Sequence, residues 1–127
     1  MKDEKSLVED EWLQYATDDL ESARLLLEKS DNYHISAYHS HQTIEKLFKW
    51  FLLKKGKKFP FIHDLKELFR QISEVAKVES LFKDVSYVDD LYPQLRYPTG
   101  EQVTQEEAQK SLIIAEKFNK IIRSLAE

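Results

Sequence analysis

The chain of 127 residues contains no cysteine, only two glycines and only three prolines. The absence of cysteine excludes disulfides, zinc sites with cysteine ligands and thiol chemistry. A β-sandwich or barrel of this length needs many more turn residues, whereas long helices joined by few loops need fewer. The composition therefore favours an all-α fold.

Other absences narrow the class of protein further. No run of about 18 apolar residues could span a membrane, and the charged N-terminus lacks the apolar stretch of a signal peptide. The net charge of −4 is not that of a dedicated duplex-DNA binder. Phosphate-loop, nucleophile-elbow and zinc-protease motifs are missing. We expect a cytoplasmic protein without a cofactor.

Apolar residues make up 42% of the chain, which is enough for one core, so we predict a single domain over residues 1–127. Apolar side chains recur every three or four residues in four segments, which indicates four amphipathic helices. We place these helices at about residues 6–29, 33–55, 64–76 and from 104 onward. Shorter helical pieces are expected at 78–85 and 87–92. The predicted fold is an up-and-down antiparallel bundle of four main helices plus a short extra helix.

Polar residues mark the expected ends of these helices. A capping box is typically a Ser, Thr or Asp with a Glu three residues later. Gly56 suits the left-handed position after the second helix, and Asp31 or Asn32 could cap its start. The three expected capping boxes pair Ser6 with Glu9, Asp64 with Glu67 and Thr104 with Glu107.

The second helix carries two polar residues on a largely apolar stripe. His41 and Glu45 are one turn apart, so their side chains can meet, and both need partners if they are buried. Arg96 is a candidate third member because it lies in a short segment between Pro93 and Pro98, which we expect to be a loop. Together, His41, Glu45 and Arg96 would form a buried structural network, line a dimer interface, or make a site for phosphate binding or acid–base chemistry.

The other histidines and lysines give weaker signals. His39 and His41 point to different helix faces, and no third ligand is evident, so we predict no metal site. His63 precedes the cap residue Asp64 and is either a functional or a loop-fixing residue. A basic cluster around the end of the second helix could attract RNA or serve the helix dipole and solubility. It comprises Lys49, Lys54, Lys55, Lys57 and Lys58.

Several motifs together resemble the HEPN domain family. They are the string AYHSHQTIEKLFK at residues 37–49, His63-Asp64-Leu65 after a Lys/Gly loop, and Arg96-Tyr97-Pro98 before the last helix. The opening pattern from Trp12 to Leu27 also fits. The resemblance covers nearly the whole chain in the right order.

The resemblance implies a helical bundle that dimerises, and a stand-alone member encoded beside a minimal nucleotidyltransferase in a toxin–antitoxin-like pair. Many HEPN proteins are metal-independent RNases with an arginine and a histidine four to six residues apart. Here no arginine has a histidine at that spacing. We therefore expect a homodimeric module that binds the phosphate of a nucleotide or nucleic acid. The expected ligand-binding residues are His41, Gln42, Glu45, Lys46, His63, Arg96 and Tyr97.

Two alternatives remain open at this stage. One is an RNase toxin in which Arg96 acts with His41 or His63, so His41 and Arg96 are the catalytic candidates. The other is a structural or assembly module with no ligand.

Overall fold

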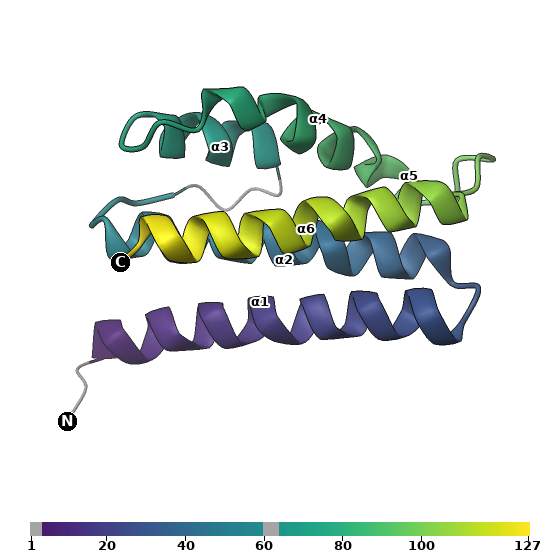
Figure 1. The fold of residues 1–127 in the computed structure, drawn as a ribbon, viewed down its shortest axis with the longest axis horizontal. Coiled ribbons are helices and arrows are strands. Elements are labelled where there is room, and N and C mark those ends of the chain that lie inside the picture. The colour runs from purple at the N-terminus through teal and green to yellow at the C-terminus, as the bar shows by residue number, and fades with distance from the viewer. Residues whose placement is uncertain (1–3, 60–63) are drawn as a thin grey trace.

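Three long helices run the length of the molecule: α1 (Glu4–Lys29), α2 (Tyr33–Lys54) and α6 (Gln105–Leu125). They come from a computed structural model that describes residues 4–59 and 64–127. In Figure 1, α1 and α2 are antiparallel, and α6 runs in the same direction as α2. All regular structure in the described residues is helical, which confirms the predicted all-α bundle. No helix among them is long and apolar enough to cross a bilayer.

The apolar stripes account for the packing of the long helices. In α2 every member of the predicted stripe is buried, and Phe48 contacts Phe118 of α6 edge-on, with ring centroids 5.3 Å apart. In α1 the buried stripe includes a polar residue, Asp19, which is only 9% exposed and contacts His39 of α2. The α2 stripe comprises Ala37, His41, Ile44, Phe48 and Phe51.

The ends of α1 and α2 differ slightly from the expectation. α1 is already helical at Glu4, so Ser6 lies inside the helix and the predicted capping box at its start is wrong. Asn32 occupies the N-cap position of α2, but its side chain makes no capping bond. Gly56 has a φ of +71° after α2, as predicted.

The segment between α2 and α6 contains four short helical pieces. These are α3 (Leu65–Ser73), η1 (Glu79–Leu81), α4 (Phe82–Asp90) and α5 (Tyr92–Arg96). The third helix ends at Ser73 rather than at 76, and the short helices do not have the bounds 78–85 and 87–92 that we predicted. Short helices have weak local signals, and their ends depend on packing against the bundle. In Figure 1, α4 and α5 carry the chain back along α2 to the start of α6.

Arg96 ends the helix α5, so the expectation of a loop between the two prolines was wrong. Pro93 lies in the first turn of α5, where a missing N–H costs no hydrogen bond. Tyr97 is extended, with φ −134° and ψ 146°, as expected for a residue before proline. The guanidinium of Arg96 is thus carried by one helical turn against α2.

Two of the predicted helix starts are capped by side chains. Asp64 accepts hydrogen bonds from the backbone N–H groups of Lys66 and Glu67 at the start of α3. The Glu67 carboxylate accepts from Arg70. At α6, Thr104 and Glu107 form the complete capping box.

Candidate functional site

The predicted ligand-binding residues lie in separate places. His41 and Glu45 are buried inside the bundle, and Gln42 and Lys46 are half-buried beside them on α2. Arg96 and Tyr97 are exposed at the end of α5. The seventh, His63, lies outside the described residues.

His41 sits in the interior and has no exposed surface. Its Nε2 lies 3.2 Å from Oδ1 of Asp89 in α4, and its ring packs on Tyr92 with centroids 4.5 Å apart. A carboxylate only accepts, so we assign the proton to Nε2. The buried Nδ1 has no hydrogen-bond partner among the described residues. His41 thus joins α2 to α4 and α5.

Asp89 connects this contact to the start of α3. Its carboxylate accepts from the backbone N–H groups of Leu65 at 3.2 Å and Lys66 at 3.4 Å. Partial burial by itself raises the pKa of Asp89, but the hydrogen bonds from His41 and Leu65 outweigh that effect and lower the pKa overall. The carboxylate is therefore a charged cap on α3 and a partner for His41 at once.

Arg96 is held by two tyrosines. Its guanidinium donates to the hydroxyl of Tyr92 at 3.1 Å and lies 5.9 Å from the ring centroids of both Tyr92 and Tyr97. The electrostatic influence of the phenols, first that of Tyr92 and then that of Tyr38, raises the pKa of Arg96. In residues 4–59 and 64–127, no carboxylate lies within salt-bridge distance of this guanidinium. The charged guanidinium of Arg96 is therefore oriented by the uncharged side chains of Tyr92 and Tyr97.

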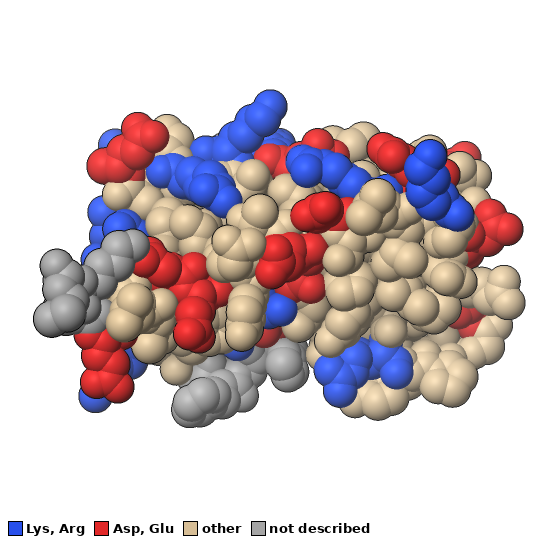
Figure 2. All heavy atoms as spheres, turned by 90° about the horizontal axis from the view of Figure 1, so that it is seen from below, with Lys and Arg blue, Asp and Glu red and all other residues tan. Residues whose placement is uncertain are grey.

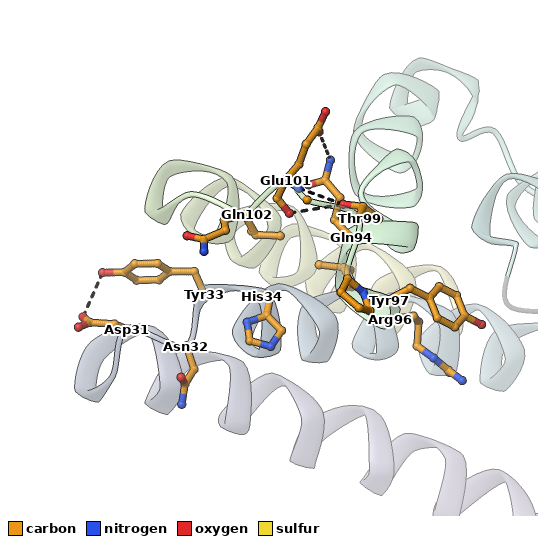
Figure 3. A pocket seen from close by; sticks show the side chains of 14 residues that line it. Asp31, Asn32, Tyr33, His34, Gln94, Arg96, Tyr97, Thr99, Glu101 and Gln102 are labelled. Carbon is orange, nitrogen blue, oxygen red and sulfur yellow. Dashed lines mark hydrogen bonds between the residues drawn. The ribbon is translucent and has the colours of Figure 1, made fainter.

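Arg96 and Tyr97 line an open cavity of about 1000 Å³ at one end of the bundle. Figure 3 shows this cavity between the start of α2, which contributes His34, and the loop that leads from α5 to α6. Gln94 crosses the loop and donates to Glu101 at 2.9 Å. Arg96 and Tyr97 form one edge of this cavity, and in Figure 3 their side chains point away from His34.

Glu45 is paired with Lys49 rather than with Arg96. The ammonium lies 3.0 Å from the Glu45 carboxylate and over the rings of Trp12 and Phe59. Glu45 is 3% exposed and Lys49 is 5% exposed. Because both side chains are buried inside one chain, Glu45 does not face a dimer interface. For the same reason Lys49 is not part of a basic surface cluster.

The sequence reasoning missed a second polar cluster, between α1 and α2. Asp19 accepts from His39 Nδ1 at 2.8 Å with one oxygen and from Lys46 Nζ at 2.5 Å with the other. The available signal was the position of Asp19 within the apolar stripe of α1, between Ala16 and Ala23. Lys46, which we predicted to bind a ligand with His41, donates to Asp19 in this cluster.

The chemistry available near Arg96 is recognition of an anion. Guanidinium groups bind phosphate through a planar fork of donors. Among the described histidines, His34 lines the same cavity as Arg96, whereas His41 has no exposed surface and lies against Tyr92. Among the described residues, no three His, Asp or Glu side chains gather as a set of metal ligands.

Comparison with known proteins places the chain in a family. The HEPN domain pattern matches residues 9–125. The protein named "Putative toxin MJ1304" from Methanocaldococcus jannaschii is 29% identical, over 88% of this chain and 84% of that protein.

Two solved structures share the fold. TT1696 from Thermus thermophilus superposes with a TM-score of 0.80 at 22% identity, covering 91% of this chain and 96% of that one. ST0689, described as an archaeal HEPN homologue, superposes with a TM-score of 0.74 at 19% identity, covering 94% and 98%.

Proposed function

Because this chain belongs to the HEPN domain family, we propose that it is a toxin-type HEPN protein that binds the phosphate of a nucleotide or nucleic acid at Arg96. The observation that supports this most is the guanidinium of Arg96, oriented by Tyr92 and bordering an open cavity without a carboxylate partner in the described residues. Tyr97, 61% exposed beside it, offers a ring on which a base can stack.

Fluorescence anisotropy with labelled ATP and labelled single-stranded RNA tests this proposal. Arg96→Ala removes the charged fork, so we expect the affinity for either probe to fall about tenfold. Arg70→Ala is the matched control, because Arg70 is an exposed arginine that already pairs with Glu67 and Glu74. Equal dissociation constants for the two variants would overturn the assignment of Arg96.

The proposed protein partner is a minimal nucleotidyltransferase, with this chain acting as a homodimer. The name of the Methanocaldococcus relative supports a toxin–antitoxin-like pair. Exposed apolar side chains support a protein interface; they include Leu7, Val8, Leu25 and Ile113. Sizing chromatography of the chain alone, and then with the protein encoded beside it, tests both points. A monomer that does not co-elute with that protein would refute them.

The RNase alternative meets a structural obstacle. His41 has no exposed surface and is covered by Tyr92, so it cannot reach an RNA hydroxyl without repacking. His63, the other candidate, lies outside the described residues. We expect total RNA to stay intact when incubated with the protein in EDTA. Cleavage that disappears in Arg96→Ala would support the RNase instead.

A further inference from the structure

The described part of the chain holds two histidine–aspartate pairs, and they differ in their access to solvent. His41 binds Asp89 through Nε2, but its side chain has no exposed surface. His39 of α2 binds Asp19 of α1 through Nδ1 at 2.8 Å, and its side chain is 27% exposed. The same type of pair is therefore closed off in the core at one position and open at the surface at the other.

The contact with Asp19 leaves the second ring nitrogen of His39 available for reaction. A carboxylate only accepts hydrogen bonds, so we assign the proton of the neutral imidazole to Nδ1, which leaves the lone pair on Nε2. Among the described residues no group is hydrogen-bonded to Nε2, and Nε2 is not one of the buried atoms that lack a partner. This nitrogen therefore reaches solvent with its lone pair unoccupied.

Lys46 brings a positive charge to the same carboxylate. Its Nζ donates to the other oxygen of Asp19 at 2.5 Å and lies 5.7 Å from the ring centroid of Tyr15. The Asp19 side chain is only 12% exposed, so it holds both of its partners in place. An ammonium has three donors, so Lys46 keeps N–H groups for the oxygens of an incoming anionic group. This arrangement favours a transferred group with negative charge over a neutral acyl group.

The surface around this pair does not attract anions in general. Figure 2 views the molecule from the side of α1 and shows acidic side chains over the N-terminal half of that helix. The net charge of the chain is −4. Long-range electrostatics therefore oppose the approach of an anionic reagent. Any reaction of such a reagent at His39 has to depend on the local arrangement of Asp19 and Lys46.

We propose that His39 is a phosphoryl-acceptor site, at which Nε2 takes a phosphoryl group from a small donor of the phosphoramidate class. The Nε2 lone pair attacks phosphorus and forms the new N–P bond. The P–N bond of the donor breaks, and its amine, already protonated in the zwitterionic donor, leaves as ammonia. Nδ1 keeps its proton, and Asp19 stabilises the positive charge that develops on the ring. Lys46 neutralises the phosphoryl oxygens.

Phosphoramidate itself is the probe, used at about pH 8, where an imidazole is mostly neutral. Mass spectrometry with electron-transfer fragmentation measures the rate at each histidine, and ³¹P nuclear magnetic resonance shows which ring nitrogen carries the group. His34 is exposed and has no carboxylate partner in residues 4–59 and 64–127, whereas His41 has a partner but is buried. We expect His39 to react at Nε2 about tenfold faster than His34, and His41 to remain unmodified.

Three variants test the roles of the neighbouring groups. Asp19→Asn keeps an acceptor but loses the charge, so the rate at His39 should fall about tenfold. Lys46→Gln should slow phosphorylation about fivefold but leave the reaction with diethyl pyrocarbonate, a neutral acylating reagent, unchanged. His34→Gln is the matched control and should leave the rate at His39 unchanged. Circular dichroism of each variant checks that the fold is intact.

The comparison within the wild-type protein needs no variant. Equal rates at His39 and His34 would overturn the proposal, and so would a phosphoryl group found on Nδ1 of His39 or on Lys46. A rate at His39 that is the same in folded Asp19→Asn as in the wild type would also overturn it. The proposal does not depend on phosphate binding at Arg96, so failure of either leaves the other standing.

Discussion

Asp89→Ala should destabilise the bundle strongly for one polar residue. The carboxylate accepts from His41 Nε2 and from two backbone N–H groups at the start of α3. Leaving the buried imidazole N–H unpaired costs about 1 to 3 kcal/mol, and losing a negative charge at a helix N-terminus costs about 0.5 to 1 kcal/mol. We expect the free energy of unfolding to fall by about 2 to 4 kcal/mol.

Asp90→Ala provides a control at the neighbouring position. Asp90 pairs with Lys66 at the surface, its side chain is 68% exposed, and such pairs contribute little to stability. Urea unfolding followed by circular dichroism at 222 nm compares the two variants. Asp89→Asn keeps a neutral acceptor and should fall between Asp89→Ala and the wild type. If Asp89→Ala and Asp90→Ala unfold at the same urea concentration, the reasoning about this network is wrong.

Three other predictions concern stability. The pKa of Asp89 is lowered from its ordinary 3.8, so the ionised carboxylate stabilises the fold above about pH 4, and this stabilisation is lost as the pH falls through the lowered pKa. The loss of stability with falling pH, followed by circular dichroism, should therefore be less steep in Asp89→Asn. Glu45→Ala leaves the Lys49 ammonium buried without its carboxylate and should cost about 3 kcal/mol or more in urea unfolding, whereas a cost under 1 kcal/mol would contradict the pairing. Thr104→Ala removes the cap that binds Glu107 N and should cost about 1 kcal/mol in urea unfolding, whereas an unchanged midpoint would contradict the capping role.

The long helices could be predicted from the sequence because each has its own apolar period. The region between α2 and α6 could not, since its helices are short and are stabilised by contacts with distant residues. Pro93 illustrates this: its sequence context suggested a break, yet at the first turn of α5 it is compatible with a helix. The position of Arg96 changed accordingly, from a loop to a helix end.

The polar contacts were predicted less well than the helices. The sequence identified His41 and Glu45 as inward-facing, but gave no indication that Asp89, 48 residues along the chain from His41, binds that histidine. The same holds for Asp19 and His39, which lie on different helices. Such pairs depend on how α1, α2 and α4 pack, which local patterns do not encode.

Nuclear magnetic resonance titration of the ¹⁵N-labelled protein tests the Arg96 site most directly. With ATP as the probe, we expect chemical-shift changes at Arg96, Tyr97 and His34 and along the loop at 98–103, which lines the same cavity. Residues around Arg70 should not shift. Changes of equal size at Arg70, or none at Arg96, would contradict the claim that this guanidinium binds phosphate.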